Sequence, residues 1–439
     1  MNNFINKKIL PPVMKLVNTR PMQALKDGMV FPLPFIIVGS IFLILAQFPF
    51  APVADFFQSI GLTAFFNQAY GGTFAIMALF AAFGIAYSWV KHAGYEATTA
   101  GMLAITVDII LQPSVLTTVS SALNPAETST AWQATNVINK AWLGGEGMIL
   151  AIISGLLVGW MYTWFMKKEI TIKMPDSVPA NVSGSFTALI PAFAIVTTAM
   201  IIYGVSMLIG QVSFVELIYG LIQQPLQHAT DGIVGVLLIS FLPVFFWFFG
   251  VHGATLISGL MMPLMLANSA DNLKLYQAGN LSMDGGAHIV TQSFMDQFTT
   301  VTGSGMTIGL LIFMLIGAKS EQMKSMGKLS LGPAIFNINE PILFGTPIVL
   351  NPLFLVPFIM MPVAAGLGTY GLISLNILPP LNGLMVPWTT PVIISGFLVG
   401  GWQHALWQAA LIGISTLMYW NFAKKYDHTL VAQQENKAA

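Results

Sequence analysis

Residues 331–362 read LGPAIFNINEPILFGTPIVLNPLFLVPFIMMP, an apolar stretch that polar residues interrupt twice. The interruptions are NINEP at residues 337–341 and NP at residues 351–352. About ten residues separate them, which is roughly 15 Å of helix and only about half of a membrane's hydrocarbon core. The stretch therefore predicts a half-length helix rather than a span.

Glu340 lies inside the first interruption. Pro341 suits the first helical position, and Asn339 before it is expected to cap the exposed amides. A carboxylate among hydrophobic residues costs free energy unless it is protonated, hydrogen-bonded or offset by a nearby helix N-terminus. Irregular backbone at membrane depth occurs only where protein buries it or where it lines a cavity. Glu340 therefore predicts a binding site, with a stabilised structural turn as the alternative.

The composition indicates a polytopic membrane protein. Hydrophobic residues make up 55% and charged residues 8% of 439 positions, whereas soluble domains have about 45–50% and about 25%. Arg20 is the one arginine, which argues against a clamp on nucleic acid. There are no cysteines, which excludes disulfides, thiol catalysis and thiolate metal sites. No metal constellation and no Gly-rich phosphate loop are present, so we expect no metal, no cofactor and no direct use of ATP.

Apolar runs long enough to cross a membrane predict an all-α protein with about ten spans. Nine such runs, of which the third is short, lie at residues 29–50, 72–90, 98–111, 147–166, 185–209, 233–250, 303–317, 354–373 and 402–422. Irregular pieces lie between the later ones, and the total is about ten crossings. Lysines and the arginine gather before the first span, at residues 91, 167–173 and 319–328, and at the carboxyl end. By the positive-inside rule, both termini are expected in the cytoplasm.

The second half of the chain is irregular. His252-Gly253 follows an aromatic run, and residues 254–262 are expected to form a second half-length segment that ends at Pro263. Paired broken segments are the best sequence indication of a transporter's substrate site. We expect four parts: a cytoplasmic amphipathic segment on the membrane surface, a regular half with five spans, an irregular half, and a cytoplasmic tail. Their bounds are 1–28, 29–230, 231–425 and 426–439.

His252 and Glu340 each stand at the start of a broken segment. A histidine donates to or accepts from a sugar hydroxyl and also acts as a base, although a lone buried histidine is often a packing residue. Trp388 and Thr389 lie in the Pro-flanked sequence PWTTP and offer an aromatic face and a hydroxyl. The alternative for Trp388 is an anchor in an interfacial belt. The remaining predicted substrate contacts are Gly253, Asn339, Thr300 and Gly303.

Three motifs resemble a known family. FGVHG at 249–253, NINEPILFG at 337–345 and PWTTP at 387–391 are similar to enzyme IIC, the membrane component of the bacterial phosphoenolpyruvate-dependent sugar phosphotransferase system. The branch that they resemble is the lactose, cellobiose and diacetylchitobiose family, and the resemblance covers essentially the whole chain. It implies a homodimer in the bacterial cytoplasmic membrane, in which 29–230 forms the dimer scaffold. Two re-entrant helical hairpins in 231–425 would hold the sugar and move by alternating access.

The resemblance also implies roles for residues and partners. His252 and Glu340 would lie near the C6 hydroxyl of the sugar, which a phosphocysteine on a separate enzyme IIB phosphorylates, with enzyme IIA acting indirectly. A chain with no cysteine cannot contain its own IIB, so it would be a transport subunit and not an enzyme by itself. We expect a permease for a β-linked disaccharide, cellobiose first and then diacetylchitobiose or lactose. The alternative is a proton-coupled disaccharide symporter in which Glu340 cycles protons.

Overall fold

The structure is a computed structural model, and it describes residues 19–46, 51–119, 131–175, 184, 186–248, 253–346, 348 and 351–438. The chain divides into two compact units. The first unit comprises Met1–Gly39 and Gly71–Pro225, and the second comprises Ser40–Tyr70 and Leu226–Ala439. The sequence also predicts a functional division near residue 230, between a scaffold half and a half that holds the sugar. That division stays a prediction.

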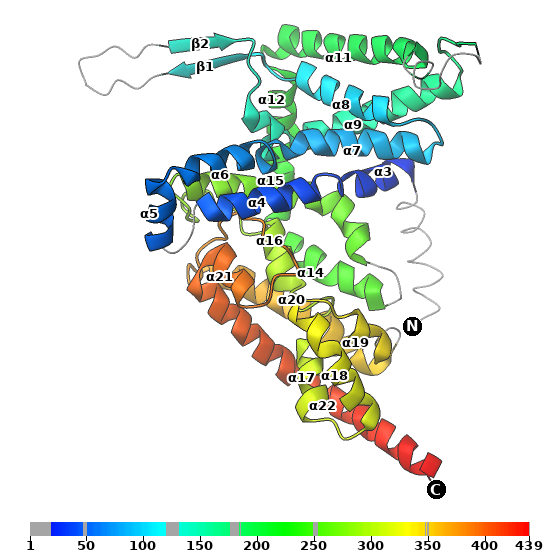
Figure 1. Cartoon of the computed structure of the whole chain (residues 1–439), viewed down its shortest axis with the longest axis vertical. Helices are drawn as coiled ribbons and strands as arrows, with labels where there is room; N and C mark the ends of the chain where they lie inside the picture. The colour runs from blue at the N-terminus through cyan, green and yellow to red at the C-terminus, as the bar shows by residue number, and fades with distance from the viewer. Residues whose placement is uncertain are drawn as a thin grey trace. The chain divides into compact units, whose positions relative to one another are not determined.

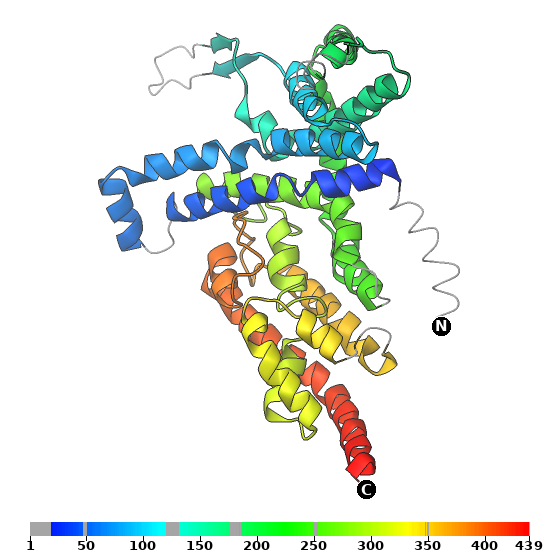
Figure 2. The ribbon, with the colours of Figure 1, turned by 45° about the vertical axis from the view of Figure 1, so that its right-hand side comes forward.

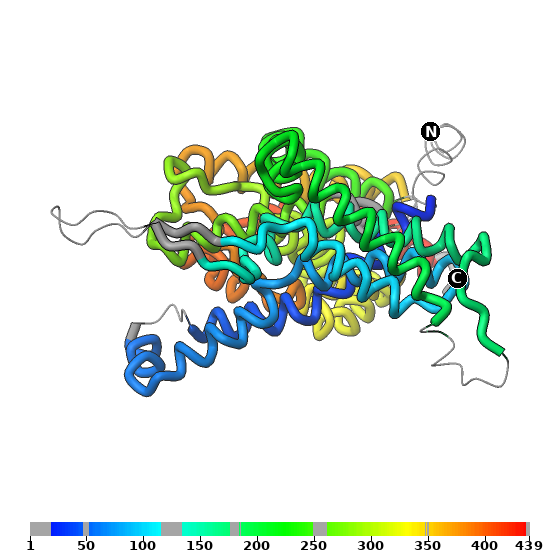
Figure 3. Tube along the Cα trace, turned by 90° about the horizontal axis from the view of Figure 1, so that it is seen from above, coloured from blue at the N-terminus to red at the C-terminus, as the bar shows by residue number. Residues whose placement is uncertain are grey.

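The first unit consists mainly of helices (Figure 1). Its elements are α3 (Arg20–Gly28), the start of α4 (Leu33–Ala46), η2 (Phe74–Ile76), α7 (Met77–His92), α8 (Thr98–Ile110), β1 (Val115–Val119), β2 (Ala131–Thr135), η3 (Lys140–Leu143), η4 (Gly145–Gly147), α9 (Met148–Lys167), α11 (Leu189–Gly210), α12 (Phe214–Ile218), η5 (Tyr219–Gln223) and the start of α13 (Gln224–Thr230). Helix α7 packs between α3, α8 and α9 (Figure 2), and α11 lies against α8 and α9 (Figure 3).

Glycines allow α7 to approach its neighbours closely. A Cβ atom added at Gly84 of α7 would lie 2.4 Å from the carbonyl oxygen of Gly28 in α3. One added at Gly155 of α9 would lie 2.8 Å from Cβ of Ile85. Small residues of this kind bring helix backbones together in membrane proteins, where packing rather than water exclusion drives association. Close packing at these glycines therefore helps to hold α3, α7 and α9 together.

Two features of the first unit refine the predictions. The segment after α8 forms an antiparallel pair, in which β1 and β2 pair from Val115 with Thr135 to Val119 with Ala131, so the chain is not wholly α-helical. Asp108 lies within the predicted span at 98–111 and is buried, and Gln112 Nε2 donates to its Oδ2 at 2.9 Å. The short helix α8 thus lies within the bundle.

The second unit contains the rest of α4, α6 and α13, together with the elements that follow. These are α5 (Ala51–Ser59), α6 (Leu62–Gly71), α14 (Ile233–Phe248), α15 (Gly253–Gln277), α16 (Gln292–Phe294), η6 (Met295–Thr299), α17 (Ile308–Ile316), α18 (Glu321–Ile335), α19 (Glu340–Gly345), α20 (Pro352–Ser374), α21 (Ile394–Gly400) and α22 (Trp402–Ala438). Helix α22 runs without interruption, and α17, α20 and α21 pack against it (Figures 1 and 2). The expected tail from residue 426 is part of this helix.

Pro263 does not end a half-length segment, so that prediction is wrong. Helix α15 is 25 residues long and continues through Pro263 to Gln277. Pro243, Pro333, Pro357 and Pro362 also lie inside helices. In a packed membrane bundle, neighbouring groups satisfy the carbonyls that a proline frees, so the helix can continue. The irregular backbone of this unit lies instead in residues 278–307 and 375–401, on either side of the short helix α19.

The described helices include five that are long and apolar enough to cross a membrane, or six if a pair bent by 71° counts as one span. The five lie at Arg20–Ala46, Leu62–His92, Gly145–Lys167, Leu189–Gly210 and Pro352–Ser374, and the bent pair is Phe214–Thr230 with Ile233–Phe248. The chain is thus a mostly helical membrane protein. The count of about ten spans stays a prediction, because helices such as α17 are shorter than the roughly 20 residues that a span requires.

Candidate functional site

Glu340 is the first residue of α19, and its side chain is exposed. Pro341 follows within the first two helical positions, as the sequence predicted. The sequence suggested a carboxylate enclosed by hydrophobic residues. Because the Glu340 side chain is exposed, it does not pay the free energy of burying a charge. Within the described ranges, no hydrogen bond reaches the Glu340 carboxylate. The carboxylate is therefore available to a ligand.

Asn339 does not cap α19, which corrects the sequence prediction. It occupies the N-cap position without a side-chain cap hydrogen bond. Its Nδ2 instead donates to the carbonyl oxygen of Ser304 at 2.7 Å and to Oγ1 of Thr307 at 2.8 Å. Asn339 thus fastens the loop at 300–307 to the start of α19, and both of its N–H groups are already used.

Asn337 joins three parts of the second unit. Its Oδ1 accepts from the backbone N–H of Thr302 at 2.9 Å, and its Nδ2 donates to the carbonyls of Trp388 and Thr390 at 2.7 and 2.8 Å. The residue is 3% exposed and adopts φ 62°, a left-handed conformation that asparagine tolerates better than most residues. Sequence reasoning gave Asn337 no role, although an Asn two residues before Asn339 in an apolar stretch was a signal.

The loop at 300–307 has an unusual backbone. Thr302, Gly303, Gly305 and Met306 have φ values of 64°, 88°, 78° and 51°. At Gly303 a Cβ atom would also lie 2.2 Å from Cγ of Asn339, so no other residue fits there. Tyr419 of α22 donates to the carbonyl of Gly305 at 2.7 Å. Such strain persists only where the surroundings fix it, and it often marks functional sites.

Thr300 begins this loop. Its Oγ1 lies 3.1 Å from the carbonyl oxygen of Met295 and 3.4 Å from that of Asp296. Because a hydroxyl has one proton, this contact leaves Thr300 able to accept from a ligand but not to donate to it. The predicted role of Thr300 as a substrate contact stays a prediction.

Gln408 of α22 holds the second irregular segment, residues 375–401. Its Oε1 accepts from the N–H groups of Ile393 and Gly396 at 2.7 and 2.9 Å. Its Nε2 donates to the carbonyl of Gln297 at 2.8 Å, and Nε2 of Gln297 donates to the carbonyl of Val386 at 3.1 Å. Ile393 has φ 77°, which is strained for a β-branched residue. These bonds place the two irregular segments side by side.

Trp388 and Thr389 lie in a turn beside Asn337. Asn337 binds the carbonyl of Trp388, while the Trp388 side chain is 52% exposed and that of Thr389 is partly exposed. An indole that is exposed and fixed by its backbone suits stacking on a sugar ring. The structure thus brings Trp388, Gly303, Asn339 and Glu340 together through the two asparagines. Sequence analysis had named all four as contacts of one substrate, but not the hydrogen bonds of Asn337 and Asn339 that connect their segments.

His252 lies outside the described residues, and so does the expected pairing of His252 with Glu340. Gly253 is described only as the first residue of α15. Among the residues that the structure describes, no group of three or more His, Asp and Glu side chains is arranged to hold a metal ion.

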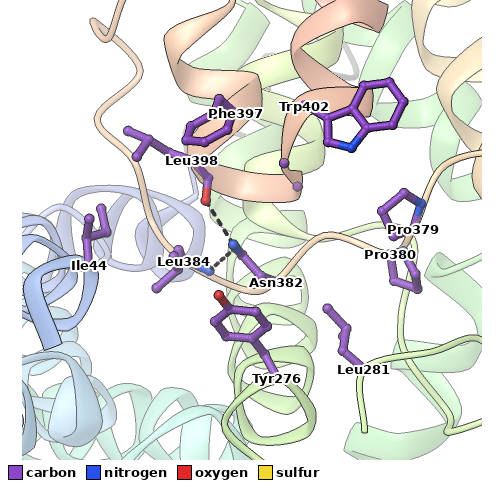
Figure 4. Close-up of a pocket in the computed structure, with 12 residues that line it drawn as sticks. Ile44, Tyr276, Leu281, Pro379, Pro380, Asn382, Leu384, Phe397, Leu398 and Trp402 are labelled. Atoms are coloured by element: carbon purple, nitrogen blue, oxygen red, sulfur yellow. Dashed lines mark hydrogen bonds between the residues drawn. The ribbon is translucent and has the colours of Figure 1, made fainter. Parts of the chain in front are cut away.

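A cavity of about 300 Å³ lies elsewhere in the second unit (Figure 4). Tyr276, Pro379, Phe397 and Trp402 line it, and none of the predicted site residues does. Asn382 also lines it, but its Nδ2 donates to the carbonyl of Leu398 at 2.8 Å and its Oδ1 accepts from the Leu384 N–H at 3.0 Å. The Asn382 side chain is thus used internally, and this cavity is not the site that the sequence predicted.

An ionisable cluster surrounds His288 in the loop before α16. Its Nδ1 lies 3.0 Å from Oδ2 of Asp231, and its Nε2 lies 3.7 Å from Oδ2 of Asp271. Burial lowers the pKa of His288, but the hydrogen bond and charge of Asp231, with the charge of Asp271, outweigh it, so the pKa is raised. Oδ1 of Asp231 accepts from the N–H groups of Ile289 and Val290 at 2.8 and 2.6 Å. The cluster therefore fastens the first part of the irregular segment at residues 278–307.

The family described as "Phosphotransferase system, EIIC" matches residues 26–362. The chain belongs to this family. The resemblance that the three motifs indicated is thus confirmed. A solved structure of ChbC, the IIC component from the N,N'-diacetylchitobiose-specific phosphotransferase system, is 32% identical to this EIIC protein. The match has a TM-score of 0.91 and covers 98% of this chain and 99% of that chain.

Curated relatives of this EIIC protein differ in their named sugars. The oligo-beta-mannoside-specific EIIC component of Bacillus subtilis (strain 168) is 35% identical, covering 99% of this chain and 96% of its own length. The cellobiose-specific EIIC component of Geobacillus stearothermophilus is 31% identical over 99% and 97%. A lactose-specific EIICB component of Lacticaseibacillus casei is 29% identical over 99% of this chain and 73% of its own length.

Proposed function

We propose that this EIIC protein carries a β-linked disaccharide, with cellobiose first and diacetylchitobiose or lactose next, across the bacterial cell membrane. It then presents the C6 hydroxyl of the sugar to a phosphorylated enzyme IIB. The relatives named for cellobiose, oligo-beta-mannoside and diacetylchitobiose support this substrate class. The observation that carries the proposal is the Asn337 side chain. It binds the loop at 300–307 through the Thr302 N–H and the turn at Trp388 through its carbonyl, three residues before Glu340 in the chain.

Glu340 and Trp388 make the principal contacts with the sugar in this proposal. The exposed Glu340 carboxylate accepts a hydrogen bond from the C6 hydroxyl and orients it. The exposed Trp388 ring stacks on a sugar face, with the Thr389 hydroxyl beside it. Asn339 shapes the Gly303 loop rather than donating to the sugar, because both of its N–H groups are used. His252, next to Gly253, serves as a hydrogen-bond partner or base.

The phosphoryl transfer needs a nucleophile and a phosphoryl donor. The chain orients the nucleophile, the C6 hydroxyl of the sugar, but it has no cysteine and so cannot supply the phosphocysteine donor. The C6 oxygen attacks phosphorus, the S–P bond of the phosphocysteine breaks and an O–P bond forms. The hydroxyl proton passes to Glu340 or His252, and the thiolate leaves on IIB. The phosphorylated sugar is charged and does not cross back, which gives transport its direction.

The proposal includes the arrangement in the membrane. The protein is a homodimer with both termini in the cytoplasm, and the half that holds the sugar alternates between the two sides. The distribution of lysines supports this orientation. Cysteine accessibility tests it: a cysteine at Lys425 should react with an impermeant maleimide only from the cytoplasmic side.

Equilibrium binding tests the site. Cellobiose, diacetylchitobiose and lactose are titrated into purified wild type, Glu340→Gln and the control Glu435→Gln, which changes an exposed carboxylate near the end of α22. We expect one preferred sugar, a Kd about tenfold or more weaker in Glu340→Gln, as loss of a hydrogen bond to a charged group predicts, and no change in Glu435→Gln. Negligible binding of all three sugars, or equal affinity in all three proteins, rules the site out.

Uptake into vesicles separates the proposal from the symporter alternative. Without IIB, a phosphotransferase permease should not accumulate sugar in response to a proton gradient. Accumulation that follows the gradient and is lost in Glu340→Gln would instead show that Glu340 cycles protons.

A further inference from the structure

Within the part of the chain that the structure describes, helix α18 is buried along one narrow side. Its buried residues are spaced at intervals of three and four, and they are Met323, Gly327, Ser330 and Ala334. The remaining face carries exposed lysines, Lys324 and Lys328, beside Leu329 and Ile335, which are 67% and 51% exposed. Exposed apolar side chains grouped beside charges are typical of a surface that binds another protein.

The end of α22 extends this surface. Oδ2 and Oδ1 of Asp427 accept from the backbone N–H groups of Lys319 and Ser320 at 2.8 and 2.9 Å. Burial raises the pKa of Asp427, but hydrogen bonds from Ser320 and Lys319 outweigh it and hold the pKa below its usual value, so the carboxylate stays charged. Lys424 and Lys425 of α22 are exposed nearby in the chain. The start of α18 is therefore held against the end of α22. Their exposed lysines outnumber Glu321, an exposed acid that pairs with Lys324 at 3.0 Å, so the combined surface is basic.

This surface connects directly to the candidate site. The chain passes from α18 through Asn337 and Asn339 to Glu340, the first residue of α19. The two helices also pack closely, because a Cβ atom added at Gly345 would lie 2.0 Å from Cε of Met326. A protein bound to α18 would thus sit on the helix that packs against α19, the element that carries Glu340.

We propose that the exposed face of α18, together with α22 around Lys424 and Lys425, is the docking surface for enzyme IIB, an inference that rests on the proposed function. This chain lacks a cysteine. The lactose-specific relative is named EIICB, and the match covers 73% of its length. Over a quarter of that relative, whose name includes a B component, therefore has no counterpart in the match. A phosphocysteine is anionic and complements the lysines, while Leu329 and Ile335 form the apolar centre.

Charge reversal tests the surface. Lys324→Glu/Lys328→Glu is compared with Lys167→Glu/Lys168→Glu, which makes the same charge change at exposed lysines at the end of α9. Phosphorylation of the preferred sugar is followed against the concentration of phosphorylated IIB encoded in the same genome. We expect the α18 variant to raise the KM for IIB about tenfold or more, with unchanged sugar Kd, and the α9 variant to match wild type. An unchanged KM in the α18 variant, or equal increases in both, overturns the proposal.

Single cysteines test it without depending on turnover, because the chain has none of its own. Ser325→Cys and Leu329→Cys on α18 and the control Lys168→Cys are labelled with an impermeant maleimide, with and without a IIB whose active cysteine is replaced by serine. We expect IIB to slow labelling at 325 and 329 but not at 168. Labelling that slows with this protein's own concentration, in the absence of IIB, would show that a second copy covers α18 and would overturn the proposal.

Together, the phosphorylation assay and the labelling assay distinguish failure of the docking surface from failure of the proposed function. If wild type phosphorylates the sugar but IIB protects neither position on α18, the docking surface is wrong and the proposed function stands. If IIB protects both positions but no sugar is phosphorylated, the surface stands and the phosphotransfer role is wrong.

Discussion

In the first unit, α7 approaches its neighbours through glycines such as Gly84 and Gly155, whereas amide side chains join the irregular segments of the second unit. A regular helix satisfies its own backbone, so only space limits how closely two helices pack. Irregular backbone leaves N–H and C=O groups unpaired, and an Asn or Gln side chain supplies both a donor and an acceptor. The glycine contacts around α7 should therefore be sensitive to added volume, and the irregular segments of the second unit to lost hydrogen bonds.

Asn337→Ala should give the largest loss of stability. It leaves the Thr302 N–H and the carbonyls of Trp388 and Thr390 without their partner, and unsatisfied buried groups cost about 1–3 kcal/mol each. We expect a loss of about 3 kcal/mol or more in thermal unfolding, and sugar binding lost with it. Asn376→Ala is the matched control, since Asn376 also has positive φ, 55°, but is exposed. Equal losses in both variants would mean that the backbone conformation, not the amide, matters.

Gly84→Ala should have the next largest effect. Its Cβ would lie 2.4 Å from the backbone oxygen of Gly28, which cannot move aside as a side chain can. Overpacking typically costs about 1–3 kcal/mol, so we expect about 2 kcal/mol in the same unfolding assay. Gly204 of α11 has nothing within 4 Å of an added Cβ. Gly204→Ala should be neutral or slightly stabilising, and a loss there as large as at Gly84 would count against packing by glycine.

His288→Gln should have the smallest effect, and one that depends on pH. Because the pKa of His288 is raised in the folded protein, its stabilisation is complete below the unfolded pKa and is lost as pH rises through the folded pKa. We expect the variant to lose about 1 kcal/mol relative to wild type at low pH and less at high pH. Asp231→Asn should add little to His288→Gln at low pH, since both break one pair. A loss that does not change with pH would exclude the ion pair.

The sequence predicted the membrane class, the family and the break at Glu340, because these depend on composition and on local motifs. The sequence did not predict side-chain hydrogen bonds whose two partners lie far apart along the chain. Asn339 was expected to cap its own helix, but Ser304 and Thr307 compete for its amide from about thirty residues away. Asn337 had no predicted role, since its partners include Trp388 and Thr390 in the other irregular segment.

Pro263 shows a different limit of sequence reasoning. A proline ends most helices in water, where the freed carbonyl has no fixed partner. Helix α15 continues through it, and the environment that permits this is set by helices elsewhere in the chain. The positions of the irregular segments therefore could not be found from prolines alone. The polar stretch before residue 303 and the run around PWTTP were the better indications.

Helix α22 spans 37 residues without a break. Gln408 touches the second irregular segment, and Asp427 binds the start of α18; at 1.5 Å per residue these two contacts lie roughly 28 Å apart on one stiff axis. If α22 tilts when a partner binds its end, the irregular segment that carries Trp388 moves with it. Coupling between two sites is reciprocal. Any factor by which a docked partner changes the affinity for sugar is then also the factor by which bound sugar changes the affinity for that partner.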